Sequence, residues 1–181
     1  MVSTFQQFLR HSTNLELKYL PNKNVLVLKG PLGVLCYLVR SKLRYSGSRK
    51  KFWLTPQGLI KKKVFSSNQV LLTQSCLGVT LGYRRQLNLV GIGYQASLEK
   101  KGSSNFLVLK LGYSHLVKLL IPDTLKVTCP KPRFVLITGT SPQKVNNFAA
   151  LLRVLKLPNP YKEKGIYYKG ETLKLKQGKK T

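Results

Sequence analysis

Apolar and polar residues alternate along most of the chain, in short runs bounded by turn-forming residues. An alternation with a period of two is typical of half-buried strands, whose successive side chains point to opposite faces of a sheet. Turn signals such as Pro21-Asn22, Gly30-Pro31 and the segment 102–105 separate these runs and suit hairpins. The runs that predict strands are NVLVLKG (24–30), GVLCYLVR (33–40), LNLVGIGY (87–94), NFLVLKLGY (105–113), HLVKLLIP (115–122), LKVT (125–128) and FVLITG (134–139).

Two segments have helical spacing instead. In the second, Ser141 is a capping residue, Pro142 suits the first helical position and Pro158 stops the helix. The apolar face of this helix comprises Val145, Phe148, Ala149, Leu152 and Leu155. In the first segment, Ser67 is the expected cap and the helix is expected to end near Gly82, although Gly78 weakens it. The apolar positions of the first helix are Val70, Leu72, Cys76, Leu77 and Val79.

Two hairpin segments are similar to each other within the chain. LELKYLPNKNVLVLKG (15–30) resembles LKVTCPKPRFVLITG (125–139) with one residue deleted, and a predicted helix follows each. Chance similarity between two hairpins is the alternative. We interpret the similarity as an internal duplication, which predicts an α+β fold of two similar domains, each an antiparallel sheet packed against a helix. The expected parts are an N-terminal extension (1–12), a first domain (13–83), a second domain (84–170) and a basic C-terminal tail (171–181).

The charge of the chain is strongly unbalanced. Thirty-two Lys and Arg face five Asp and Glu, so the formal net charge is +27 and most cations have no internal partner. A solvated basic face explains a single cluster, but here the excess runs from end to end. A polyanion is the expected partner, because each Lys or Arg that contacts a phosphate releases the counterions of that phosphate, and this release favours binding. If about eight cations contact phosphates, the logarithm of the affinity falls with the logarithm of the salt concentration at a slope of about −7.

The basic segment 41–65, which carries Phe52 and Trp53 among its cations, is interpreted either as an exposed hairpin with solvated lysines or as a further contact with the polyanion.

The first 14 residues, MVSTFQQFLRHSTN, lack acidic residues and faintly resemble an organellar transit segment. Because Met1 is retained, we expect a short extension, or a protein made in the compartment where it works.

Cysteine spacing and hydropathy argue against several classes of protein. Cys36, Cys76 and Cys129 are odd in number, far apart and without a CxxC pair, which suggests neither a disulfide framework nor a zinc site. We interpret them as small apolar residues in a reducing compartment. No apolar run approaches the roughly 20 residues that span a bilayer. No metal, cofactor or small-molecule substrate is expected.

Candidate catalytic motifs are weak. Gly91-Ile92-Gly93-Tyr94-Gln95-Ala96 matches a dinucleotide fingerprint, but under two helical turns follow it and no acid lies about 20 residues on, so we expect a bulge or a close backbone approach. The five carboxylates and two histidines are scattered too thinly for paired acid and base chemistry. Ser114 and His115 either fix a hairpin corner by hydrogen bonding or contact a phosphate or ribose.

The segment LPNPYKEKGIYYKG (157–170) reads as a loop of fixed shape. Two prolines stiffen the exit from the helix, and Gly165 and Gly170 let the backbone turn, so cations on this loop lose less entropy on docking than cations on a free tail. Tyr161, Tyr167 and Tyr168 either pack on the domain or stack on an unpaired base. Beyond Glu171 the tail has little apolar surface and is expected to order only against a polyanion.

These residues resemble the bacterial-type family of large-subunit ribosomal protein six. Its C-terminal signature is of the type PEPYKGKG(I/V)RY, and residues 158–168 read PNPYKEKGIYY, with Glu163 in place of a glycine and Tyr167 in place of a basic residue. NVLVLKGPLG (24–33), GVTLGYRRQLNLVGIGYQA (78–96) and LGYSHLV (111–117) resemble further family motifs in the family's order. The resemblance covers roughly residues 13–181, and the family's usual opening, SRIGKxPI, is missing.

The resemblance implies a duplicated α+β fold and a structural, non-catalytic role. It implies binding of large-subunit rRNA, mainly through the second domain and tail, near the sarcin-ricin loop and the base of the stalk, beside neighbouring ribosomal proteins and translation factors. We expect Tyr161 and Gly165 to shape the binding loop. The expected phosphate contacts are Lys162, Lys164, Lys169, Lys174, Lys176, Lys179 and Lys180, with Arg84, Arg85 and Arg153 as secondary contacts.

The compartment is expected to be the mitochondrion, because the chain is rich in Lys, Leu, Asn, Phe and Tyr, keeps Met1 and lacks the bacterial opening. A plastid or bacterial protein is the alternative.

Two other functions fit a basic surface. An RNA-modifying or RNA-cleaving enzyme would need convergent carboxylates, and a peripheral protein of anionic membranes would need a cationic amphipathic helix.

Overall fold

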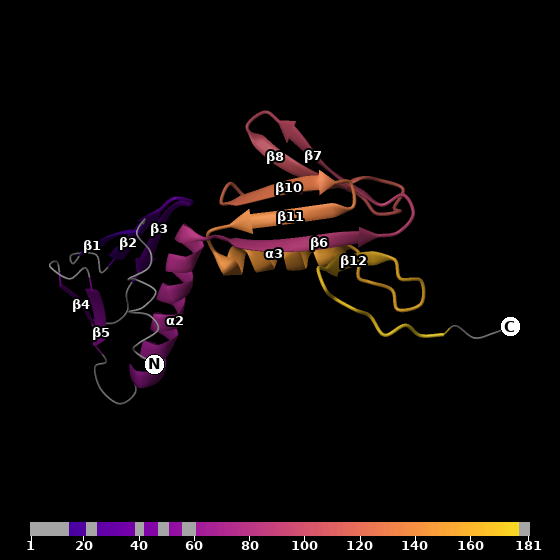
Figure 1. Cartoon of the computed structure of the whole chain (residues 1–181). Helices are drawn as coiled ribbons and strands as arrows, with labels where there is room; N and C mark the ends of the chain where they lie inside the picture. The colour runs from indigo at the N-terminus through magenta and orange to yellow at the C-terminus, as the bar shows by residue number, and fades with distance from the viewer. Residues whose placement is uncertain (1–14, 21–24, 39–41, 47–50, 56–60, 178–181) are drawn as a thin grey trace. The chain divides into compact units, whose positions relative to one another are not determined.

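A computed structural model describes residues 15–20, 25–38, 42–46, 51–55 and 61–177 of the chain. The chain divides between Gly82 and Tyr83 into two compact units, here called unit 1 (1–82) and unit 2 (83–181). Among the described residues, each unit pairs antiparallel strands with one helix, so the expected α+β class is confirmed (Figure 1).

Unit 1 is built on a three-stranded antiparallel sheet whose order follows the sequence. Leu26 and Leu28 of the central strand are fully buried, because they alternate with Val25 and Val27 and face the helix. Leu72, Cys76 and Val79 of that helix complete the core. The elements are β1 (Glu16–Leu20), β2 (Val25–Gly30), β3 (Gly33–Leu38), the separate hairpin β4 (Lys42–Ser46) and β5 (Lys51–Thr55), and helix α2 (Lys61–Thr80).

Helix α2 is longer than the sequence pattern predicts. Ser67 lies inside the helix rather than at its cap, since the helix begins at Lys61. The lysines at 61–63 are good helix formers but carry no apolar periodicity, so they gave no signal. Near the C-terminal end of α2, the helix packs closely against Gly30, which has no side chain. A Cβ at position 30 would lie 2.5 Å from Val79 Cγ1 and 2.8 Å from Val79 O.

The three cysteines of the chain are free thiols. Cys76 is fully buried, and desolvation raises the pKa of its thiol to about 12, which fits the interpretation as a small apolar residue. Burial also raises the pKa of Cys129, which is half-buried. Cys36 is exposed on the face of β3 that points away from α2, so it is not a core residue.

Unit 2 combines two antiparallel sheets with one helix. The four-stranded sheet has the order β10-β11-β6-β12, and helix α3 lies along one of its faces (Figure 1). The three-stranded sheet has the order β7-β8-β9. The elements are β6 (Tyr83–Val90), β7 (Gln95–Lys101), β8 (Ser104–Lys110), β9 (Val117–Leu120), β10 (Leu125–Lys131), β11 (Phe134–Gly139), α3 (Pro142–Leu155) and β12 (Gly165–Tyr168).

Helix α3 forms where the sequence predicts it. Ser141 occupies the N-cap with extended backbone angles, although its side chain makes no capping hydrogen bond, and Pro142 takes the first helical position. The helix buries Val145, Phe148, Ala149 and Leu152, and Leu155 packs at the edge of this core. This face meets the alternating inward side chains Leu87, Leu89, Val135, Ile137 and Ile166 of the sheet.

The two segments that resemble each other in sequence both form antiparallel strand pairs, and the second pair has a register shift between Thr128 and Lys131. β1 pairs with β2, and β10 pairs with β11, both antiparallel, and a helix follows each hairpin in the chain. The sheets are therefore consistent with the expected duplication.

Two strands of unit 2 lie where the sequence analysis placed none. Residues 95–101 form β7, and residues 165–168 form β12 within a segment interpreted as a loop. At the expected bulge, Gly91 and Gly93 form the turn before β7, and the ring of Tyr94 packs against Gly91 so closely that a Cβ there would lie 2.9 Å from ring carbons.

Candidate nucleic-acid interface

Residues 156–165, here called the 156–165 loop, comprise the connection between α3 and β12 and the first residue of β12, and Asn159 holds them in one shape. Its side-chain oxygen accepts hydrogen bonds from the backbone N–H of Tyr161 (2.8 Å) and of Lys162 (3.4 Å). Its own N–H donates to the carbonyl of Lys164 at 3.0 Å, and its carbonyl accepts from the N–H of Glu163 at 3.0 Å. Lys162 and Lys164 are exposed on this closed loop, so their charges project from a fixed backbone.

Gly165 lies at the base of the loop, where the two ends of the loop come together. It is buried, with a φ of +156°, and a Cβ at this position would lie 2.5 Å from Pro158 Cα and 2.9 Å from the carbonyl oxygen of Leu157. The N–H of the next residue, Ile166, donates to the carbonyl of Lys156 at 2.9 Å. The two ends of the loop therefore touch through backbone atoms, and Gly165 begins strand β12 instead of a free turn.

Glu163 has a backbone conformation that glycine adopts more readily than other residues. Its φ is +57°, and among the described residues no other residue except glycine has a positive φ. Its carbonyl also accepts a hydrogen bond from the Tyr167 hydroxyl at 2.8 Å. The chain thus holds a side-chain-bearing residue in the left-handed region, at a cost of about 1–2 kcal/mol.

Replacing Glu163 by glycine is expected to stabilise unit 2 by about 0.5–1 kcal/mol, because relief of this strain exceeds the added entropy of the unfolded chain. The hydrogen bonds of residue 163 use its backbone, so they survive the change. Chemical denaturation of wild type and Glu163→Gly measures the difference. Glu163→Ala, which keeps the strain and loses the charge, is the control, and equal stability of the glycine and alanine variants would contradict this explanation.

A basic hollow of about 460 Å³ lies where β12 ends beside β6. Lys169 follows β12, and its N–H donates to the carbonyl of Gln86 at 3.0 Å, which brings its side chain to Arg84 and Arg85 of β6. Arg85 Nε donates to Asn146 Oδ1 at 2.9 Å, and all three cationic residues are exposed. The fold thus brings Lys169 to a pair of arginines that lie 84 and 85 residues earlier in the sequence. The hollow is lined by Arg84, Arg85, Gln86, Leu136, Tyr168 and Lys169.

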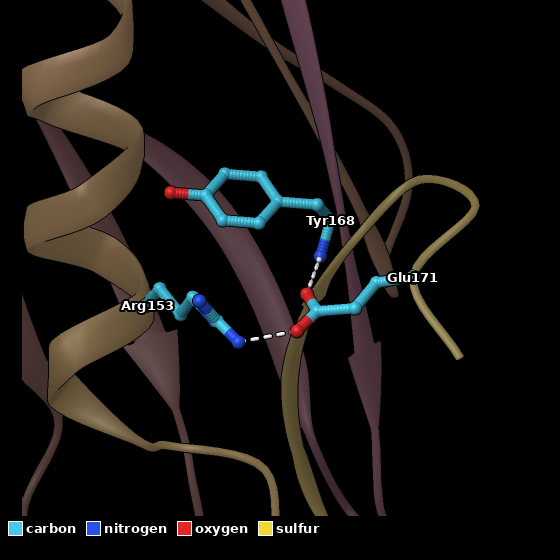
Figure 2. A network of polar contacts seen from close by, with 3 residues as sticks. All are labelled: Arg153, Tyr168 and Glu171. Atoms are coloured by element: carbon cyan, nitrogen blue, oxygen red, sulfur yellow. Dashed lines mark hydrogen bonds and ion pairs between the residues drawn. The ribbon is translucent and has the colours of Figure 1, made fainter. Parts of the chain in front are cut away.

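The tail is anchored along unit 2 through residue 176. Glu171 pairs with Arg153 of α3 and accepts the N–H of Tyr168 at 3.1 Å, as Figure 2 shows. The N–H of Lys176 donates to the carbonyl of Pro160 at 3.1 Å, which joins the tail to the 156–165 loop. Two backbone hydrogen bonds, from Glu171 to Tyr168 and from Lys176 to Pro160, thus tie residues 171–176 to unit 2, while ordering of the tail against a polyanion stays a prediction.

The predicted site residues fall into three places on unit 2. Lys162 and Lys164 are on the loop, with Tyr161 exposed beside them, while Arg84, Arg85 and Lys169 share the hollow. Lys174 and Lys176 are exposed on the tail. Arg153 differs, because its guanidinium points to Glu171 and lies 5.2 Å over the Tyr168 ring. Lys179 and Lys180 lie outside the described residues.

Ser114 and His115 are exposed on the loop between β8 and β9. Tyr113 holds this corner by donating its hydroxyl proton to the carbonyl of Leu155 at 2.9 Å, and the His115 ring stacks on Tyr113 with centroids 6.0 Å apart. Lys156 Nζ lies 4.3 Å from the centroid of the Tyr113 ring. The corner therefore adjoins the end of α3, close in sequence to the 156–165 loop.

The three tyrosines of the loop segment have different environments. Tyr161 is exposed, whereas Tyr167 and Tyr168 are both half-buried, and Tyr168 packs on the core beneath Arg153. Desolvation raises the pKa of Tyr167, and the negative charges of Glu163 and Glu171 raise it further. Its hydroxyl therefore stays protonated and donates to the Glu163 carbonyl.

Sequence reasoning missed Asn159 and Lys156. The Asn-Pro dipeptide at 159–160 is a turn signal, so the role of Asn159 in the loop could have been predicted from the sequence. Lys156 gave no comparable signal, because its contact with Tyr113 joins positions 43 residues apart.

Within the ranges that the structure describes, no helix is long and apolar enough to cross a membrane. The same ranges contain no cluster of three or more His, Cys, Asp or Glu side chains placed to hold a metal ion. Three ion pairs join described residues, namely Lys29 with Glu16, Lys118 with Glu99, and Arg153 with Glu171. The 32 cationic residues of the chain thus greatly outnumber the carboxylates that could neutralise them.

The fold and surface define a two-unit α+β protein with a strongly basic surface. A profile of the ribosomal protein L6 family matches residues 90–169. Large ribosomal subunit protein uL6 of Mycoplasmoides gallisepticum is 38% identical over 161 residues, which cover 87% of this chain and 86% of the relative. The uL6 protein of Thermosipho africanus is 38% identical over 166 residues, which cover 87% and 88%. Large ribosomal subunit protein uL6m of Reclinomonas americana is 42% identical over 117 residues, which cover 65% and 61%.

The chain therefore belongs to the ribosomal protein L6 family, in its bacterial-type form. It is a structural protein of the large ribosomal subunit and not an enzyme. This excludes the RNA-modifying or RNA-cleaving alternative.

Proposed function

We propose that the chain binds large-subunit rRNA through unit 2 and the C-terminal tail. The observation that carries this proposal is the clustering of exposed cations on three neighbouring parts of unit 2: the 156–165 loop, the hollow beside β6, and the tail. The tail and the loop are joined by the hydrogen bond from Lys176 to Pro160, and Lys169 links β12 to the hollow. A net charge of +27 makes a polyanion the favoured partner.

The proposed contacts are with phosphates and therefore fix the position of the protein without reading base sequence. Lys162 and Lys164 act from a closed loop, which lowers the entropy lost on docking. Arg84, Arg85 and Lys169 line the same hollow and together supply positive charge for a phosphate that approaches it. Lys174 and Lys176, followed by Lys179 and Lys180, extend the contact along the tail.

Ser114 and His115 are proposed to contact the ribose or phosphate of a strand that also reaches the loop. Their exposure and the anchoring of Tyr113 at the end of α3 support this role. The His115 ring, already stacked on Tyr113, can also support an unpaired base.

The proposed binding region on rRNA is the factor-binding side of the large subunit, near the sarcin-ricin loop and the stalk base. Support comes from the family resemblance of the C-terminal signature at residues 158–168. In this position the protein would lie among neighbouring large-subunit proteins and near translation factors.

The proposed compartment is the mitochondrion. The match to the uL6m protein of Reclinomonas americana and the richness in Lys, Leu, Asn, Phe and Tyr support it. Bacterial relatives cover more of the chain, so a bacterial ribosome is the competing assignment. Fractionation decides between them: co-purification with mitochondrial ribosomes supports the proposal, and its absence from mitochondria contradicts it.

A salt titration of binding to the cognate large-subunit rRNA tests the proposal. With about eight phosphate contacts, the logarithm of the affinity should fall against the logarithm of the salt concentration with a slope of about −7. Transfer RNA is the control for binding by charge alone, and it should bind more weakly at every salt concentration. A slope near zero, or equal affinity for both RNAs, would contradict the proposed function.

A further inference from the structure

Glu171 is an acidic residue at the root of a basic tail, in a chain with only five acidic residues. Its carboxylate has two partners, and both are hydrogen-bond donors. One oxygen pairs with the Arg153 guanidinium, and the other accepts the Tyr168 N–H at 3.1 Å (Figure 2). The N–H of Glu171 also donates to the carbonyl of Tyr168 at 3.1 Å, which closes a tight turn.

Arg153 is a rigid anchor for this contact. It lies in the last turn of α3, whose other face is buried in the core of unit 2. Its guanidinium lies over the Tyr168 ring, and its side chain is 32% exposed, while that of Glu171 is 21% exposed. A pair enclosed to this degree is screened less by salt than an exposed pair.

We propose that Glu171 is a positioning residue for rRNA binding: with Arg153 it ties the root of the tail to α3, so that the tail lysines leave unit 2 in one fixed direction. This inference rests on the proposed function. It assigns Arg153 to act through Glu171 and not by contact with a phosphate. Downstream, the bond from Lys176 to Pro160 holds the tail beside the loop that carries Lys162 and Lys164.

In this proposal Glu171, although acidic, raises the affinity of the chain for rRNA. A tethered tail loses less conformational freedom when it docks than a free tail with the same lysines. Neutralising a carboxylate should strengthen binding to a polyanion by charge alone, but neutralising Glu171 also releases the tail. The two effects have opposite signs, and the proposal requires release to dominate.

Glu163 supplies a matched control. It is also a carboxylate of unit 2, eight residues before Glu171, and it lines one hollow with Glu171. Its backbone is hydrogen-bonded, but no hydrogen bond or ion pair to another described residue holds its carboxylate. Glu163→Gln and Glu171→Gln therefore change the net charge equally and differ in the tether.

The experiment measures affinity of the full chain and these variants for the cognate large-subunit rRNA at fixed salt. Separate oxygens of Glu171 accept from Arg153 and from the Tyr168 N–H, and glutamine replaces one of them by an NH₂ group and loses the charge, so Glu171→Gln should bind about fivefold more weakly than wild type. Glu163→Gln should bind as tightly or about twofold more tightly. In a chain that ends at Thr172, Glu171→Gln should no longer weaken binding, because there is no tail to position.

A second measurement separates the tether from the stability of unit 2 and does not need RNA. Hydrogen exchange of the Lys176 amide should speed up in Glu171→Gln, while the amides of α3 keep their protection. Tighter binding by Glu171→Gln, or an equal loss of affinity in the chain that ends at Thr172, would overturn the proposal. If wild type itself fails to bind rRNA, the proposed function fails, and unchanged exchange at Lys176 in the variant would then overturn the tether as well.

Discussion

Replacement of Gly165 by alanine should destabilise unit 2 by at least about 3 kcal/mol, a loss expected from strain that cannot relax. The added Cβ would lie 2.5 Å from Pro158 Cα, 2.8 Å from Pro158 N and 2.9 Å from the Leu157 oxygen. All three are backbone atoms, so no side-chain rotation can relieve the overlap. The φ of +156° adds strain for a residue with a Cβ.

The change should displace the start of β12 and open the 156–165 loop, because the Ile166 to Lys156 hydrogen bond lies at the same place. For a unit of this size, about 3 kcal/mol lowers the melting temperature by roughly 12 °C or more. Circular dichroism should show this shift. Trp53, the single tryptophan, belongs to unit 1. Its fluorescence therefore follows the unfolding of unit 1, whose melting temperature should change little in this variant.

Gly170→Ala is the matched control for Gly165→Ala. Gly170 also has a positive φ, of +83°, but an added Cβ would meet no atom within 4 Å. Its replacement should cost only about 1 kcal/mol, which is the conformational penalty without the overlap. Equal losses in the two variants would contradict the claim that backbone contact at Pro158 makes Gly165 necessary.

Removal of residues 173–181 should weaken rRNA binding on the order of a hundredfold at physiological salt, since four phosphate contacts would be lost. The lost lysines are Lys174, Lys176, Lys179 and Lys180. The slope of log affinity against log salt should become shallower by about 3. Because Glu171 and Arg153 stay in place, the stability of unit 2 should change little.

A charge-matched comparison shows whether position or total charge matters. Lys174→Gln with Lys176→Gln removes two charges from the tail, and Lys100→Gln with Lys101→Gln removes two exposed charges from β7. The tail pair should weaken binding to large-subunit rRNA much more than the β7 pair. Equal effects would mean that the protein binds RNA through its net charge and not through the tail.

Local periodicity predicted the elements that have strong, regular patterns. Helix α3 was predicted with its cap, its first-turn proline and its apolar face, because five apolar residues repeat at helical spacing. The hairpin β10–β11 and its counterpart β1–β2 were predicted from alternation and from their mutual similarity. These features depend on residues close together in the sequence.

Elements that depend on distant partners were missed. Strand β12 has only four residues and begins at a glycine, so it forms because β6 offers a free edge for residues 165–168. Strand β7 is polar at most of its positions and gains its place by pairing with β8. The start of α2 was missed because three lysines carry no apolar pattern.

The candidate site shows the same limit. Its lysines and the fixed loop were predicted from composition and from prolines and glycines, but the hollow that joins Lys169 to Arg84 and Arg85 depends on the β6–β12 register. Arg153 looked like one more cation in the sequence. Its pairing with Glu171, 18 residues later, follows from the turn after β12, which no local pattern indicates.

Sedimentation combined with RNA crosslinking tests the central claim most directly. An extract of the source cells or organelles is resolved on a sucrose gradient at moderate salt, and the protein is then crosslinked to RNA within each fraction. We predict that the full chain migrates with the large ribosomal subunit and that crosslinked peptides from 156–177 carry large-subunit rRNA. Recovery of the protein at the top of the gradient, free of rRNA, would contradict the account.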